Sequence, residues 1–117
     1  MLTAKEARET RQATMDEYAH KADEEIQKML PQIENQIIKA CKKAATSATV
    51  SLIYPKDYDP LLRRAIWEKL MNLLREHGYD ANWENTVTEK SSSWWRKNEE
   101  KIIDKIVVEW RYEHLWN

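Results

Sequence analysis

The chain has 117 residues, of which 42% are apolar and 33% charged, and its 19 basic side chains nearly balance 20 acidic ones. This length suits one compact domain spanning residues 1–117. The balanced charge argues against a general nucleic-acid binder, which needs surplus Lys and Arg. No apolar run approaches the roughly 18 residues of a membrane span, and the charged start is unlike a signal peptide, so we expect a cytoplasmic protein without membrane contact.

Cysteine, glycine and histidine limit the chemistry further. Cys41 has no second cysteine to pair with, and its place on an apolar helical stripe predicts a buried side chain. Gly78 alone cannot build the glycine-rich loops of Rossmann or P-loop phosphate sites. The histidines are scattered, without metal-ligand spacing: His20, His77 and His114. We therefore expect no cofactor, no metal site and no enzymatic activity.

Residues 3–45 predict a long N-terminal helix. They lack glycine, and apolar side chains recur at 26, 29/30, 33, 37, 40/41 and 44, the spacing of one buried stripe. Pro31 predicts a kink near residues 29–31, either a gentle bend or a true corner. Residues 3–22 offer mostly alanine methyl groups, so this part either packs on a partner or frays in solvent. We treat residues 1–30 as a helical arm for a partner or second subunit.

A strand and a second helix follow. Residues 48–54 alternate, with Val50, Leu52 and Tyr54 on one face, which predicts a half-buried strand. Asp59 and Pro60 are typical of a helix N-cap and first turn, and this helix should end near His77. Gly78 predicts a left-handed C-terminal cap.

Two further strands complete the pattern. Residues 79–85 and 105–112 alternate, with Trp83, Ile106 and Val108 among the inward side chains. The order predicts an α+β fold in which a long kinked helix precedes β-α-β-β, giving a small mixed three-stranded sheet with helices on one face. The strand order, 1-2-3 or 1-3-2, stays open.

The connection between these strands, residues 87–103, is longer than a usual hairpin loop, and residues 93–103 could form a short helix. It contains adjacent tryptophans beside basic residues. These indoles could pack on their own domain, anchor a protein partner, or stack on bases. The candidate partner-binding residues are Trp94, Trp95, Arg96 and Lys97, with Trp67 and Met71 of the second helix.

The strings "MLTAKEA", "IIKACKKAATSATVSL", "LMNLLREHGYDANWE" and "IVVEW" resemble a broad group of small tailed-phage proteins, mostly of unassigned function. Similar proteins tend to have a glycine between the first helix and first strand, where this chain has "AATSA". The resemblance implies a phage accessory protein in the host cytoplasm that binds a host protein or neutralises an antiviral system. It carries no catalytic residues across.

Together these features favour a non-enzymatic binding protein acting through protein–protein contacts. Its surplus of large apolar side chains predicts a homo-oligomer, with a dimer favoured, that also binds a host or phage protein. One alternative is a module for a small ligand or single-stranded nucleic acid, although nucleic acid is not favoured. Another is a structural component of a phage particle.

Overall fold

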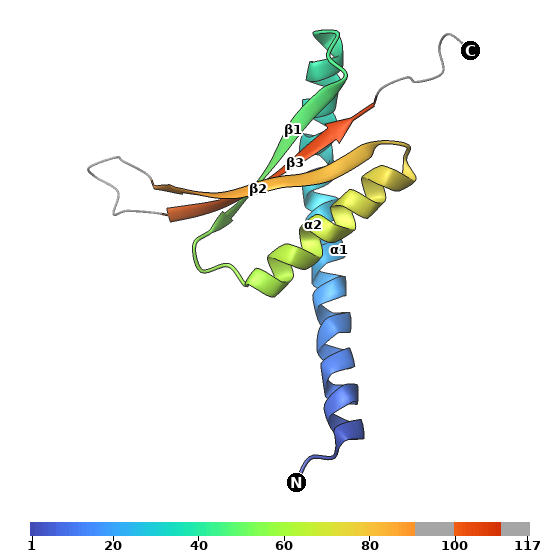
Figure 1. The fold of residues 1–117 in the computed structure, drawn as a ribbon, viewed down its shortest axis with the longest axis vertical. Helices are drawn as coiled ribbons and strands as arrows, with labels where there is room; N and C mark the ends of the chain where they lie inside the picture. Colours follow the sequence, from blue (N-terminus) through green and yellow to red (C-terminus); the bar gives the residue numbers. More distant parts are fainter. Residues whose placement is uncertain (91–99, 111–117) are drawn as a thin grey trace.

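The computed structural model describes residues 1–90 and 100–110. Two helices and three strands form an α+β fold, which confirms the expected class (Figure 1). In chain order they are α1 (Ala4–Lys42), β1 (Ser47–Pro55), α2 (Pro60–Glu76), β2 (Asp80–Lys90) and β3 (Glu100–Glu109).

The sheet has the order β1-β3-β2, and β3 runs antiparallel to both neighbours. Of the two orders left open by the sequence, 1-3-2 is therefore the one adopted. The prediction of a mixed sheet is wrong, because the described sheet contains no parallel neighbours. The α2 crossover makes β1 and β2 run the same way but leaves a gap between them, and β3 fills that gap.

Helix α1 continues through Pro31 as a single helix of 39 residues. Of the two alternatives that the sequence left open, a gentle bend and a true corner, the corner is therefore excluded. Ile26 and Ile33, one on each side of the proline, are 4% and 3% exposed and belong to the same core. Because packing holds both segments against one surface, it outweighs the hydrogen bond that Pro31 cannot donate.

Both helices end with a residue in the left-handed conformation. Gly78 follows α2 with φ 91°, as predicted, and the next amide, of Tyr79, donates to the Leu74 carbonyl at 3.0 Å. Ala44 takes the same position after α1 with φ 61°, although it carries a Cβ atom. The missing glycine in "AATSA" is thus replaced by a strained alanine and not by a different turn.

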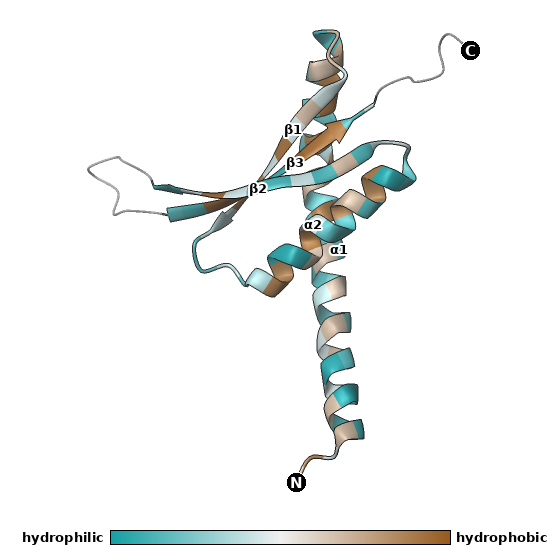
Figure 2. Ribbon diagram, in the orientation of Figure 1, coloured by the Kyte–Doolittle hydropathy of each residue, from teal (hydrophilic) through white to brown (hydrophobic). Residues whose placement is uncertain are grey.

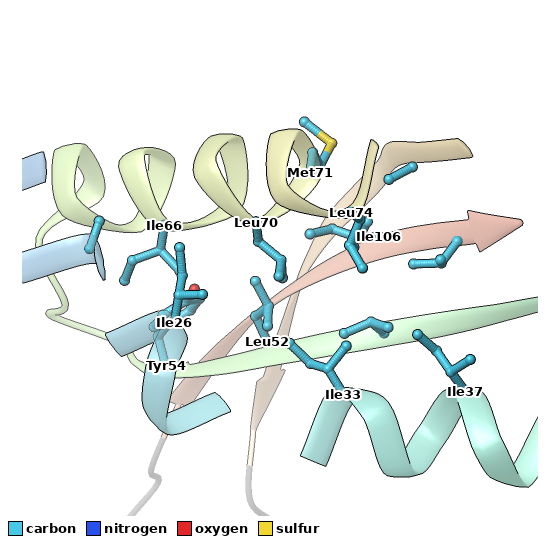
Figure 3. Close-up of a cluster of buried hydrophobic side chains, with 14 residues drawn as sticks. Ile26, Ile33, Ile37, Leu52, Tyr54, Ile66, Leu70, Met71, Leu74 and Ile106 are labelled. Carbon is cyan, nitrogen blue, oxygen red and sulfur yellow. The ribbon is translucent and has the colours of Figure 1, made fainter. Parts of the chain in front are cut away.

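The core lies between the two helices and one face of the sheet. Figure 3 shows side chains of α1, α2 and the strands meeting there. The buried apolar residues on the helices are Ala22, Ile26, Ile33, Ile37, Ile66, Leu70, Met71 and Leu74. Those of the core on the sheet are Val50, Leu52, Tyr54, Ala81, Ile106 and Val108. Since one cluster contains residues of both helices, both cover the same face, as expected.

The hairpin strands extend further toward each other than predicted. The β2–β3 ladder reaches Lys90, which pairs with Glu100. The prediction of a long connection over residues 87–103 is therefore wrong. Residues 100–103 belong to β3 and not to a short helix. The rest of that predicted helix lies outside the described residues. Residues 86–90 alternate weakly because all of them except the half-buried Val87 are exposed on an edge strand.

Asp104 occupies an inward position of β3 and is fully buried. The Thr86 hydroxyl donates to its Oδ1 at 2.6 Å, and Arg63 Nε of α2 lies 3.3 Å from its Oδ2. These contacts tie the start of α2 to the centre of the sheet. They thereby position α2 relative to the sheet.

Candidate protein-binding surface

The first part of α1 projects from the domain (Figure 1). Every side chain from residue 1 to residue 17 is exposed, and burial begins at Tyr18. We call residues 4–17 the arm; about 14 helical residues span about 21 Å. The predicted arm, residues 1–30, is longer, but Ala22 and Ile26 belong to the domain core.

Local interactions support the arm in place of tertiary packing. Thr3 Oγ1 accepts the Glu6 amide at 3.2 Å, and the Thr3 hydroxyl donates to the Glu6 carboxylate at 3.1 Å. Gln12 bonds to Asp16 at 2.9 Å. In Figure 2 this part of α1 is mainly hydrophilic or weakly hydrophobic, in contrast to β3. Because the docked part of α1 already supplies a helical nucleus, the arm needs only propagation.

A hollow of about 540 Å³ opens where the arm leaves α2, and we call it the arm groove. Met15 and Leu61 are its large apolar side chains and are 45% and 62% exposed. The groove is lined by Arg11, Met15, Tyr18 and Ala19 of α1, and by Leu61, Arg64, Ala65, Glu68, Lys69 and Asn72 of α2. A lining of both apolar and charged side chains suits an amphipathic helix.

Two contacts fix the angle between the arm and α2. The Tyr18 hydroxyl donates to the Asp59 carboxylate, whose other oxygen accepts the Leu61 amide at 3.0 Å as the N-cap of α2. The bond from Tyr18 lowers the pKa of Asp59 below its ordinary value and raises that of Tyr18. Lys69 Nζ donates to the Ala19 carbonyl at 3.1 Å and to Asp23 at 2.9 Å. The groove is therefore held open from both helices.

A second apolar surface lies across α2, where Trp67 and Trp83 stack with ring centroids 6.2 Å apart at 27°. Trp67 is half-buried, and Trp83 of β2 is 45% exposed. The alternation in β2 predicted that Trp83 faces inward. Trp83 does lie on the face of the sheet that carries the core, because it pairs with Ile106. It stays accessible because β2 is an edge strand and Trp83 lies at the rim of the core.

Other predicted site residues fall elsewhere. Met71, a predicted contact residue, is only 8% exposed because it packs in the core cluster, so it offers little surface to a partner. Residues 94–97, with the predicted contacts Trp94, Trp95, Arg96 and Lys97, lie outside the described residues.

Cys41 is exposed, contrary to the prediction of a buried side chain. It lies in the last turn of α1, whose last buried residue is Ile37. The sequence stripe continues past Ile37, but the covering core does not, so periodicity alone predicted too much burial.

Two histidines, His20 and His77, contact neighbouring groups of their own helices. His20 is exposed and lies 3.0 Å from Glu24. His77 caps α2, with Nδ1 2.9 Å from the Leu73 carbonyl oxygen. His114 lies outside the described residues. Among the described residues no three metal-ligating side chains gather in one group.

Comparisons with protein-family models, curated proteins and solved structures found no match. Neither of the two described helices combines the length and apolar content needed to cross a bilayer. The surface that the geometry distinguishes is thus the arm with its groove, a shape suited to docking a helix.

Proposed function

We propose that the protein is a non-enzymatic binding protein that self-associates through the arm and the arm groove and contacts a further protein partner. One observation carries this proposal. About 14 helical residues, every side chain of them exposed, stand beside an open groove that is lined by both apolar and charged side chains of the same molecule. A surface that offers both the insert and the receptor is self-complementary.

The proposed dimer has two-fold symmetry. The arm of one copy lies in the arm groove of the other, and the two arms run antiparallel side by side. Each arm then contacts the partner's arm on one side and the partner's α2 on the other. Met15 and Leu61, which are exposed in the single chain, become covered.

The charge of the arm favours the antiparallel arrangement. Residues 4–11 carry three basic and two acidic side chains, a net charge of +1, whereas residues 12–17 carry only Asp16 and Glu17, a net charge of −2. Antiparallel arms place the positive half of one against the negative half of the other. Parallel arms would oppose like halves.

The dimer should be of moderate strength. Its apolar contribution comes mainly from Met15, Leu61 and alanine methyl groups, and short helix pairs bury areas near the low end for specific interfaces. We expect a dissociation constant on the order of micromolar, weaker at high salt.

Charge reversal tests this arrangement by sedimentation velocity over a range of protein concentrations. Lys5→Glu with Arg8→Glu should weaken the dimer, and Asp16→Lys with Glu17→Lys should do the same. An equimolar mixture of the two variants should restore association, because opposite arms then match again.

A matched control keeps the net-charge change but leaves the arm intact. Lys28→Glu with Lys39→Glu changes exposed lysines of α1 outside the arm and should leave the dimer unchanged. A wild-type chain that stays monomeric at the highest attainable concentration would refute self-association. Equal loss in the control would show a net-charge effect and refute the antiparallel pairing.

The further partner is proposed to be a host or phage protein, following the resemblance to tailed-phage proteins. Trp67 stays in the proposed contact, now with Trp83 beside it, because a stacked and accessible indole pair is typical of an interface anchor. Trp94 to Lys97 stay a prediction from the sequence. Co-purification from expressing cells with wild type and Trp83→Ala tests the contact, and equal capture by both would remove Trp83 from it.

A further inference from the structure

The outer edge of β1 has free backbone hydrogen-bonding groups. The Trp110 amide donates to the Thr46 carbonyl at 3.0 Å, and these two residues stand opposite each other in the register that continues as Ser47 with Glu109. In an antiparallel ladder, hydrogen-bonded and non-hydrogen-bonded pairs alternate. The even-numbered residues of β1 therefore bond to β3, and the N–H and C=O groups of Thr49, Ser51 and Ile53 point away from the sheet.

The opposite edge, on β2, is blocked. The Arg75 guanidinium donates to the Ala81 carbonyl at 3.1 and 2.7 Å, and a bulge interrupts the register between Trp83 and Asn85. The strand also carries several charges. Proteins protect edge strands by such devices. By contrast, β1 pairs without a register shift and has no charged residue from Ser47 to Pro55.

Helix α1 forms a wall along the free edge. A hollow of about 140 Å³ lies between them, lined by Met29, Gln32 and Gln36 of α1 and by Ser51 and Ile53 of β1, among others. Its lining contains no charged side chain. Gln36, one of the lining residues, has a buried Oε1 atom without a hydrogen-bond partner among the described residues, so its capacity to accept a hydrogen bond is unused.

We propose that this edge binds an extended, uncharged segment of a partner protein as a fourth strand. The segment bonds to the backbone of Thr49, Ser51 and Ile53. Its side chains alternate between the wall formed by α1 and the open face, where Ile53 is 58% exposed. Pro55 has no N–H group and ends the pairing, so about five residues of the partner are engaged.

The groove favours a single strand over a second copy of β1. Each β1 has its own α1 packed beside it, so pairing two β1 edges would also have to accommodate two α1 helices along the same edge. A lone strand needs only the usual interstrand spacing of about 4.8 Å. The neutral lining disfavours charged segments, since a desolvated charge would stay unpaired.

The site is independent of the arm, so separate variants test it. The probes are a fluorescein-labelled peptide with the sequence of residues 47–54, SATVSLIY, a panel of other uncharged octapeptides, and the same peptides with one central Asp. Fluorescence polarisation should show saturable binding of uncharged peptides, with at least tenfold weaker binding of the Asp peptides. Absence of binding by the whole uncharged panel would overturn the proposal.

Ser51→Pro is the decisive variant. It removes an N–H group that faces away from β3, so the sheet should keep its fold, which circular dichroism and thermal unfolding will check. Ser51→Ala keeps the N–H group and is the matched control. Binding should fall at least tenfold in Ser51→Pro and stay within twofold in Ser51→Ala. Equal binding by both would refute strand addition.

A second measurement covers the case in which Ser51→Pro unfolds. Amide hydrogen exchange of the wild type should slow at Thr49, Ser51 and Ile53 when peptide is added, and unchanged exchange would refute the proposal. Lys5→Glu with Arg8→Glu should retain peptide binding. If Ser51→Pro, rather than the arm variant, abolishes dimerisation, the edge holds a second copy and the peptide proposal fails.

Discussion

Asp104 and Arg63 form an ion pair beneath α2, with Arg63 Nε 3.3 Å from Asp104 Oδ2. The carboxylate is fully shielded from solvent, and the arginine side chain is 21% exposed. Neither of these two atoms has a hydrogen bond of good geometry within the described residues. The pair therefore depends on charge attraction, and Thr86 supplies a side-chain hydrogen bond to the carboxylate.

Removing one member of this pair should cost more than removing both. Arg63→Met leaves a buried, uncompensated carboxylate and should lower the free energy of unfolding by about 3–5 kcal/mol. Arg63→Met with Asp104→Leu replaces both charges by apolar groups and should recover most of that loss. Urea unfolding of the two single variants and the double variant measures the coupling. Additive losses would mean that the pair does not interact.

The left-handed residue after each helix gives a pair of opposite predictions. Ala44→Gly should raise the free energy of unfolding by about 0.5–1 kcal/mol, because glycine adopts positive φ without a Cβ penalty. The Ala45 amide donates to the Ala40 carbonyl at 3.0 Å in the wild type, and the variant should keep this bond. Thermal unfolding should show a melting temperature a few degrees higher.

Gly78→Ala should lower the free energy of unfolding by about 1 kcal/mol. A Cβ atom at Gly78 would meet no atom within 4 Å, so the loss comes from the backbone conformation alone. A gain in Gly78→Ala or a loss in Ala44→Gly, measured by the same thermal unfolding, would contradict the assignment of both caps.

Pro31 should reduce the stability of the helix that contains it. It cannot donate to the Gln27 carbonyl four residues earlier, so Pro31→Ala should raise the free energy of unfolding, by up to about 3 kcal/mol. Glu34→Ala, at an exposed position about one turn later, is the matched control and should change it by less than about 0.5 kcal/mol. An unchanged midpoint in urea for Pro31→Ala would show that packing has absorbed the whole cost.

Tyr54 should make the protein less stable in alkali. Burial, and then the charge of Asp104, raises the pKa of its hydroxyl above the ordinary 10.0. A raised pKa favours the folded state below pH 10, and this contribution is lost as the pH rises further. Unfolding in urea at about pH 8 and about pH 11 should show a smaller loss for Tyr54→Phe than for wild type.

The same substitution should cost little near neutral pH, because the Tyr54 hydroxyl has no hydrogen-bond partner in the described part of the chain. Tyr18 and Tyr58 also have raised pKa values, so the variant keeps part of the alkaline loss. Identical pH profiles for both proteins would remove Tyr54 as a cause.

Local patterns predicted several elements correctly. The three-four spacing of Ile26, Ile33 and Ile37 indicated α1, and the alternation of Val50 and Leu52 indicated β1. Asp59 and Gly78 marked the ends of α2. These features depend on residues within one or two turns of each other, so a single segment contains the information.

Other features required the folded chain. Apart from Val87, residues 86–90 of β2 are polar, and only their pairing with β3 makes them a strand. Asp104 interrupts an apolar alternation, so it was not assigned to the core; extending the pattern of Ile106 and Val108 back by two residues would have placed it inward. The arm groove joins residues about 50 positions apart, which no local pattern brings together.

From the sequence alone come the helices, the strands, the apolar face of each and the α+β class, because periodicity and caps act over short stretches. Tertiary structure alone decided the position of β3 between β1 and β2, the continuity of α1 through Pro31 and the exposure of Cys41. It also left one sheet edge open and blocked the other. Each of these depends on which distant segments meet, and their burial is determined by the neighbours and not by the residue itself.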